Sequence, residues 1–278
     1  MRLSLALQRF DSTNLRLRII SAAFMAPIAL LAVYLGGLVY AAVITCAVTI
    51  GLYEWLRLIA PDMKTQTVSI ACAFVVALMG AGAILPPEAS AFFGLVFTVA
   101  LYLISSLRDQ NKNATWIAMG IPYMGGCGLA LLALRASPDY GMAIVFYLLA
   151  VVWCTDIGAY LFGCLIRGPK LAPSISPRKT WAGFFGGMAS ATIVGYAVAV
   201  WLGAKEPSAA LLLSPVLSGV AQAGDLFESY FKRRSGVKES GDLIPGHGGV
   251  LDRIDGLVFA GAFVFLFQAM FGVSINWW

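Results

Sequence analysis

Carboxylates at regular spacing are grouped near the C-terminal end of the chain. Asp225 and Glu228 are three residues apart near the end of one apolar segment, and Asp252 and Asp255 repeat that spacing at the start of the next. Residues three apart lie on one face of a helix. Carboxylates brought together repel one another unless cations lie between them, and hard divalent cations prefer oxygen ligands. The spacing predicts a Mg²⁺ site, with enough carboxylates for a second metal ion.

A fifth carboxylate, Asp156, lies inside the apolar run YLLAVVWCTDIGAYLFGCLI. An unpaired carboxylate in hydrocarbon costs at least a few kcal/mol, so Asp156 should face a polar cavity or a cation. At ~1.5 Å per residue, Asp156 lies roughly 16 Å and Asp225 roughly 10 Å from the nearest basic residue of the polar loops. All five carboxylates can therefore converge on one cavity as metal ligands. The alternative for Asp156 is a hydrogen-bonded residue between packed helices.

Ordinary ion pairs are the alternative for two of the other acids. Glu228 is four residues from Lys232, and Asp252 is next to Arg253, so each could form a simple pair at the end of a helix. The sequence leaves this alternative open beside the metal site.

Groups that recognise phosphate surround these acids in two polar loops. A polybasic loop alone would more often indicate membrane topology and contact with anionic lipid head groups. Basic residues interleaved with acidic metal ligands indicate a phosphorylated substrate that is neutralised from both sides. The residues concerned are Ser176, Arg178, Lys179 and Thr180 in the first loop and Lys232, Arg233, Arg234, Lys238, Gly248 and Gly249 in the second.

His247 is the only histidine of the chain, and glycines flank it on both sides. It could donate to phosphate, transfer a proton or cap a loop. We favour phosphate contact, because a phosphate nucleophile needs no general base.

The composition requires a membrane protein. The 278 residues are 60% hydrophobic and only 12% charged, and the mean hydropathy is +0.83, whereas soluble domains carry about 25% charged residues. The five cysteines occur singly in apolar segments, which excludes a disulfide framework and a zinc site as explanations for them. A nucleic-acid partner is not expected either.

Nine segments are long enough to cross the bilayer as helices. The sequence therefore predicts an all-α, polytopic integral membrane protein with a polar cavity that faces the cytoplasm. We interpret residues 1–278 as a single membrane domain, with N-terminal helices in 1–140 and the catalytic helices and loops in 141–278. The predicted spans are 19–36, 38–56, 68–86, 89–107, 115–134, 141–166, 182–203, 208–231 and 255–274.

The basic residues are divided very unequally between the two sides of such a bundle. With the N-terminus inside, 17 of the nineteen lysines and arginines lie on one side, and the other side holds only Arg135 and Lys205. By the positive-inside rule, the N-terminus and the candidate site are cytoplasmic and the C-terminus is external. In a bacterium this places the chain in the inner membrane.

The polar residues of the second loop resemble the signature of the phosphatidate cytidylyltransferase (CDP-diacylglycerol synthase) family. The pattern, S-x-x-K-R-x4-K followed by P-x-H-G-G-x-x-D-R-x-D, is long and specific. It is matched by Ser229, Lys232, Arg233, Lys238, Pro245, His247, Gly248, Gly249, Asp252, Arg253 and Asp255. The runs DIGAYLFG, KLAPSISPRKTW and GDLFES are similar to other family blocks, so the resemblance covers the C-terminal half, while the first 140 residues match only as hydrophobic helices.

The resemblance implies a reaction. CTP and phosphatidic acid give CDP-diacylglycerol and pyrophosphate with Mg²⁺, when the lipid phosphate attacks the α-phosphorus of CTP in line. It implies catalytic roles for Asp225, Asp252, Asp255, Lys232, Lys238 and His247, and metal binding by Asp225, Asp252, Asp255, Asp156 and Glu228. Substrate binding falls to Ser176, Lys179, Thr180, Arg233, Arg253, Gly248 and Gly249. The family often forms homodimers, for which this sequence itself provides no sign.

Two positions depart from the family pattern. Glu239 stands where the family has Asp, and Ala182 replaces a frequent Glu.

Two other functions compete with the transfer of a cytidylyl group. An ion-coupled transporter is the first rival, because acids inside a membrane also mark ion pathways. A CTP-dependent lipid kinase is the second. The clustering of the acids beside loops on one side argues against a transporter.

Overall fold

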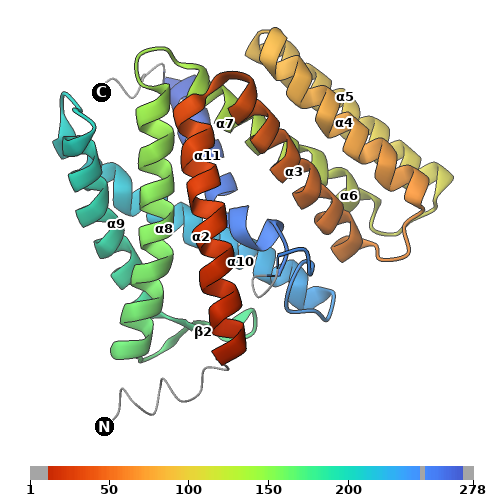
Figure 1. Ribbon diagram of the computed structural model, residues 1–278. Helices are drawn as coiled ribbons and strands as arrows, with labels where there is room; N and C mark the ends of the chain where they lie inside the picture. Colours follow the sequence, from red (N-terminus) through yellow and green to blue (C-terminus); the bar gives the residue numbers. More distant parts are fainter. Residues whose placement is uncertain (1–11, 245–247, 272–278) are drawn as a thin grey trace.

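The computed structural model describes residues 12–244 and 248–271, so Pro245 and His247 of the signature lie outside the described residues. Figure 1 shows a bundle of long helices. The helices are α2 (Ser12–Leu35), α3 (Gly37–Ile59), α4 (Thr65–Ile84), α5 (Pro87–Leu103), η1 (Ile104–Arg108), α6 (Ala114–Ala118), η2 (Ile121–Gly126), α7 (Cys127–Ala136), α8 (Gly141–Leu165), α9 (Trp181–Trp201), η3 (Pro207–Ala209), α10 (Ala210–Arg234) and α11 (Leu251–Phe271). The strands are β1 (Lys170–Ala172) and β2 (Ser176–Thr180).

The helices confirm the predicted all-α membrane architecture. Eight stretches of the described chain are long and apolar enough to cross a membrane, and α2 adds a shorter apolar stretch, Ala23–Leu35. Each coincides with one of the nine predicted segments. The predicted segment 115–134 is not one regular helix, because α6, the π-helix η2 and α7 follow one another in it. In this span, Ala114–Ala136, 72% of the most apolar 18-residue stretch is buried inside the protein, the largest share among the eight.

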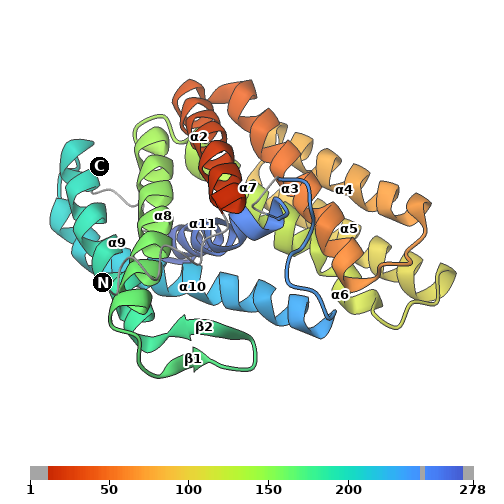
Figure 2. The ribbon, with the colours of Figure 1, turned by 60° about the horizontal axis from the view of Figure 1, so that its bottom comes forward.

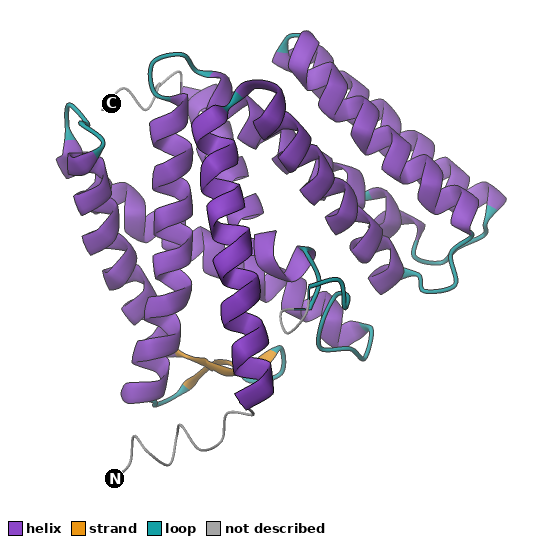
Figure 3. Ribbon diagram, in the orientation of Figure 1, coloured by secondary structure: helices purple, strands orange, loops and turns teal. Residues whose placement is uncertain are grey.

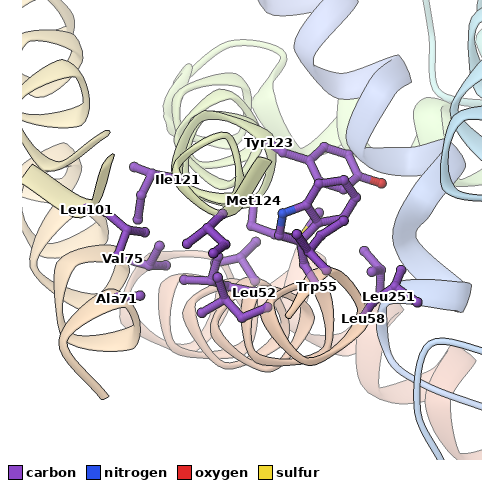
Figure 4. Packing of buried hydrophobic residues seen from close by; sticks show 14 of the residues in the cluster. Leu52, Trp55, Leu58, Ala71, Val75, Leu101, Ile121, Tyr123, Met124 and Leu251 are labelled. Carbon is purple, nitrogen blue, oxygen red and sulfur yellow. The ribbon is translucent and has the colours of Figure 1, made fainter. Parts of the chain in front are cut away.

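One core cluster joins the N-terminal helices to α10. Trp55 of α3 is fully buried, and its indole N–H donates to the carbonyl oxygen of Trp116 over 2.9 Å. Its ring packs edge-on against Tyr123 and Phe231, with centroids 5.0 and 4.8 Å away. Figure 4 shows Trp55 and Tyr123 side by side among the aliphatic side chains of this cluster. Edge-to-face pairs of this kind add about 0.5–1.5 kcal/mol beyond the area that they bury.

A second cluster holds α8, α9 and α10 together. Tyr147 of α8 and Ser214 of α10 are both buried, and their hydroxyl groups hydrogen-bond over 2.7 Å. The helices α8 and α9 approach closely because Gly158 and Gly186 face the opposite helix, where any side chain would collide with Ser190 or Phe162. Small residues at contacts between helices are typical of membrane bundles.

Arg135 caps the end of α2, which gives this basic residue of the sparsely charged side a structural role. Its Nε donates to the carbonyl oxygen of Val33 at 2.7 Å, and a guanidinium nitrogen lies 3.4 Å from that of Tyr34. A cation at a helix C-terminus is favourable for the helix dipole. Gly36, at φ +63°, forms the following turn against the same guanidinium group.

The β-hairpin was not predicted from the sequence. β1 and β2 pair antiparallel, with Lys170 opposite Thr180 and Ala172 opposite Ser176, and Figure 3 shows them as the strands of an otherwise helical bundle. Pro173 disfavours a helix in this segment. The hairpin lies beside α10 in Figure 2 and at the end where α2 begins in Figure 1. The connections α7–α8 and α9–α10 lie at the opposite end.

Candidate functional site

The site begins where α10 and α11 approach each other. Gly224 of α10 faces the backbone of α11, and a Cβ atom there would lie 2.7 Å from the carbonyl oxygen of Asp255. Glycine therefore permits a contact between the helices that no other residue allows. Asp225 follows Gly224 directly, so this contact brings Asp225 to the first turns of α11.

Four of the five predicted carboxylates gather at this contact. Glu228 is fully buried, and its carboxyl group interacts directly with that of Asp255. Neither oxygen of Glu228 accepts a hydrogen bond within the described part of the chain. Asp225 and Asp255 both act electrostatically on Asp156, which α8 supplies from the other side. Three helices thus contribute to one acidic group of residues, whereas the convergence of all five carboxylates on one cavity stays a prediction.

Lys232 links this group to the fifth carboxylate. Its ammonium nitrogen lies 3.3 Å from Glu228 Oε1 and 2.5 Å from Asp252 Oδ1. The ion pair between Glu228 and Lys232 that the sequence allowed is therefore present. Asp252 pairs with Lys232 rather than with its neighbour Arg253, which is exposed. Because Lys232 is 8% exposed, its charge is held between the two acids with little solvent.

The second oxygen of Asp252 anchors the loop before α11. Asp252 Oδ2 accepts hydrogen bonds from the amide and the hydroxyl of Ser240 and from the amide of Gly249, each at 2.9 Å. Gly248, at φ +77°, packs so closely that a Cβ atom would lie 2.7 Å from the same oxygen. The amide of Gly249 is therefore committed to Asp252, and phosphate binding by the two glycines stays a prediction.

The hairpin supplies a second cation to the acidic residues. Lys179 of β2 forms an ion pair with Asp225 at 2.6 Å, and Ser229 donates to the other oxygen of Asp225 over 3.2 Å. Arg233 donates to the carbonyl oxygen of Ile175, which ties the hairpin to the end of α10. The two polar loops that the sequence singled out are thus joined in space.

The remaining predicted substrate residues lie around this junction in different settings. Thr180 is buried and caps α9, because its hydroxyl oxygen accepts a hydrogen bond from Gly183. Ser176 is partly buried in β2, whereas Lys238 and Arg253 are exposed. His247 lies outside the described residues. Lys238 and Arg253 therefore present their charges to solvent near the acidic residues.

One buried acid was missed from the sequence. Glu54 of α3 is 4% exposed, and its carboxylate accepts hydrogen bonds from the amides of Val250 and Leu251 at 3.0 and 2.7 Å. A carboxylate inside the apolar segment 38–56 is the same signal that identified Asp156. The signal was available, but no spacing related Glu54 to residues almost two hundred positions away.

A cavity of about 680 Å³ lies between the same loop and the N-terminal helices. α3 lines it with Tyr53, Glu54 and Arg57, and the loop contributes the segment 240–243. Within the described ranges, none of the five predicted carboxylates lines this cavity, which adjoins them through Ser240 and Glu54.

The carboxylates of the site suit a hard cation as ligands, although the described side chains do not already enclose a metal ion. Within residues 12–244 and 248–271, no three acidic, histidine or cysteine side chains are close enough to enclose a metal ion. Among the residues that the structure describes, the ion pairs of these five carboxylates involve two ammonium groups, those of Lys179 and Lys232. Glu228 also keeps two buried oxygens without hydrogen-bond donors. Glu228 is buried, whereas Asp225 is partly exposed and Asp156 is exposed. This excess of negative oxygens fits a divalent cation as a further partner of the carboxylates.

Comparison with known proteins identifies relatives over nearly the whole chain. A model of the cytidylyltransferase family matches residues 16–271. A phosphatidate cytidylyltransferase of Brucella suis is 39% identical over 262 residues, which cover 93% of this chain and 95% of the relative. A protein of the same name from Bacillus subtilis is 32% identical over 274 residues, with 93% and 99% covered. A third, from Staphylococcus saprophyticus, is 38% identical over 179 residues, 62% of this chain and 64% of the relative.

Proposed function

The chain belongs to the cytidylyltransferase family, and from this premise we propose that it transfers the cytidylyl group of CTP to phosphatidic acid. The products are CDP-diacylglycerol and pyrophosphate. Relatives named phosphatidate cytidylyltransferase support this substrate pair, because they align with 93% of the chain at up to 39% identity.

One structural observation carries the proposal. Acidic and basic side chains alternate at the junction of the hairpin, α10 and α11, where Lys179 pairs with Asp225 and Lys232 bridges Glu228 and Asp252. Such an arrangement offers metal ligands and phosphate partners side by side. In phosphoryl-group transfer the protein mainly positions the reactants and neutralises charge, and these residues suit both tasks.

We propose that Mg²⁺ binds the carboxylates that meet where α8, α10 and α11 approach one another. Asp225 and Asp255 are the primary candidates, with Glu228 and Asp156 beside them. Asp225 would exchange Lys179 for the metal, whereas hydrogen bonds and an ion pair hold both oxygens of Asp252 at the loop before α11. When bound, the metal would offset the negative charge of the triphosphate. A second metal ion stays a prediction based on the number of carboxylates.

The side chains themselves would orient the two phosphates. Lys179 pairs with Asp225, and we propose that it exchanges this partner for a phosphate oxygen when substrate binds. An oxygen of the lipid phosphate would then form a bond to the α-phosphorus of CTP. The bond from that phosphorus to the bridging oxygen breaks, and pyrophosphate leaves with the electron pair. Exposed Arg233, Lys238 and Arg253 are suited to bind the charged groups during this exchange.

We further propose the inner membrane as the location, with the N-terminus and the site facing the cytoplasm. The bacterial relatives and the strongly unequal charge division support this assignment. CTP would arrive from the cytosol, while the acyl chains of the lipid remain in the bilayer. Assembly into a homodimer also stays a prediction.

The test is incubation of purified protein with α-labelled CTP, phosphatidic acid and Mg²⁺. We expect labelled lipid and an equal amount of pyrophosphate, and we expect both to disappear when the metal is chelated. Labelled CDP without pyrophosphate would identify a lipid kinase instead. If no nucleotide is consumed with any divalent metal, the transporter interpretation gains and the proposal fails.

A further inference from the structure

Glu54 lies in the N-terminal half of the chain, but it binds a segment of the site that belongs to the C-terminal half. It lies on α3, yet its carboxylate accepts the amides of Val250 and Leu251, where α11 begins. The first amides of a helix have no partners within it, and a negative charge there is favourable for the helix dipole. Glu54 therefore caps α11 from a distant helix. Asp252, the next residue of α11, follows this cap directly.

Ser240 extends the contact from Glu54 to Asp252. Its hydroxyl lies 3.3 Å from Glu54 Oε2 and 2.9 Å from Asp252 Oδ2. Gly249 fills the space between these groups so closely that a Cβ atom would collide with both Ser240 and Glu54. Asp252 in turn holds Lys232. The chain of contacts thus runs from α3 to a cation that lies among the acids of the site.

Packing alone does not fix this loop on the side of α3. Its segment 240–243 borders the cavity of about 680 Å³ instead of close-packed side chains, and Leu243 is 60% exposed. At the start of the connection, Ser235 donates to the carbonyl oxygen of Leu58 over 2.7 Å. Near α11, the hydrogen bonds of Glu54 are the directional contacts that set where the loop lies relative to α3.

We propose that Glu54 is a positioning residue for the transfer reaction, an inference that rests on the proposed function. Its carboxylate fixes the loop before α11, so that Asp252 keeps Lys232 in place beside Glu228. The N-terminal helices are then more than a membrane support, because α3 contributes one contact on which the geometry of the site depends.

The test compares Glu54→Gln with Glu88→Gln. The glutamine retains the size of the side chain but places an NH₂ group against one of the two amides, so one hydrogen bond is lost. Glu88 is an exposed acid at the start of α5 and provides the matched control. We expect kcat per folded protein to fall roughly 10- to 100-fold in Glu54→Gln, because a displacement of ~1 Å can cost about 10²-fold. The KM for CTP should change by less than about threefold, since both oxygens of Glu54 are already engaged by Val250, Leu251 and Ser240, and the control should match wild type.

Two further measurements separate positioning from general stability. Amide hydrogen exchange in the peptide 239–251 should become faster in Glu54→Gln, while exchange in α8 and α9 stays unchanged. Ser240→Ala should lower kcat in the wild-type background but have a smaller effect in Glu54→Gln, because both residues act on the same loop.

Normal kcat in the folded Glu54→Gln protein would overturn the proposal, as would a loss of activity that only follows the loss of folded protein. If the wild type forms no labelled lipid, the proposed function fails and the positioning role falls with it. The exchange experiment then still shows whether Glu54 anchors the loop.

Discussion

Asp252 and Asp255 share one face of α11 but have different surroundings. Asp252 is surrounded by Lys232, Ser240 and Gly249, so both of its oxygens are occupied. Asp255 instead accepts the amide of Gly256 and faces the carboxyl group of Glu228. The sequence assigned both to the metal. The structure distinguishes an acid that holds the loop from one that faces another carboxyl group.

We expect Asp252→Asn and Asp255→Asn both to abolish CTP turnover but to differ in their effect on the stability of the fold. Asp252→Asn removes the charge that pairs with Lys232 and should lower the free energy of unfolding by about 1–3 kcal/mol. Asp255→Asn removes a buried charge that Asp225 repels and should leave the protein at least as stable as wild type. Thermal unfolding in detergent, measured beside CTP turnover, checks both expectations. Near-normal activity in both variants would contradict their roles at the site.

At the scale of elements, the site depends on how closely α10 and α11 pack. Gly224 permits the approach, and Asp225 and Asp255 meet because of it. Two connections then complete the arrangement, since the hairpin brings Lys179 and the loop before α11 brings Ser240. Each element alone carries charges at its end, and only their contact produces a site.

Gly224→Ala should therefore disturb the site without changing any charged residue. The added Cβ atom would meet the backbone of Asp255 at 2.7 Å, so the helices must separate. Overpacking of this kind costs about 1–3 kcal/mol, and we expect CTP turnover to fall at least ~10-fold because the carboxylates move apart. Gly219→Ala is the control on the same helix, since open space surrounds that position. Equal activity of the two variants would disprove the close-contact argument.

The connection between α3 and α4 makes a peripheral, pH-dependent contact with Asp109, which follows η1. Thr67 donates to Asp109 over 2.6 Å and Lys64 pairs with it at 2.9 Å. The hydrogen bond from Thr67, together with the charge of Lys64, holds the pKa of Asp109 below its usual range. A lowered pKa stabilises the fold above the pKa of the unfolded state, about 3.9, and this contribution disappears as the pH falls through the folded value.

Asp109→Asn should thus cost about 1 kcal/mol at pH 7, a small amount because Lys64 is 58% exposed. The difference from wild type should shrink below about pH 4. Unfolding at several pH values measures it, with Asp62→Asn, an exposed acid in the same connection, as the control. A difference that is constant with pH would refute the assignment.

At the scale of the whole molecule, both halves of the chain build the site. The core around Trp55 links α3 to α10 through Phe231, and Glu54, the residue before Trp55, holds the start of α11. The helices of 1–140 therefore both embed and brace the catalytic half. The predicted sidedness also belongs to this scale, because it concerns every loop at once.

Cysteine labelling should reveal that sidedness. In a variant without the five native cysteines, we expect Lys205→Cys to react with a membrane-impermeant thiol reagent added outside spheroplasts. Lys112→Cys, in an exposed loop on the other predicted side, should react only after the membrane is opened. The reverse pattern would invert the topology and place the site on the external face.

The separation into membrane helices could be read directly from the sequence, because lipid requires long apolar runs and each run is local. In the described residues, eight apolar helices and the shorter stretch Ala23–Leu35 match the nine predicted segments. The hairpin β1–β2 and the π-helix η2 were not foreseen. A π-helix differs from an α-helix only in the register of its own hydrogen bonds, which hydrophobic periodicity does not mark, and the strands of the hairpin are only a few residues long. The sequence also named the carboxylates near α10 and α11, because buried charge is rare in apolar segments.

By itself, the sequence determined that most of this protein lies in lipid, that it folds into membrane helices, and which kinds of residues could act on phosphates. The tertiary structure alone decided which acids are free and which are already paired, and it revealed Glu54 as the contact from α3. The physical reason is that composition and spacing act along the chain, whereas pairing energy depends on distances of about 3 Å between atoms that can be almost two hundred residues apart.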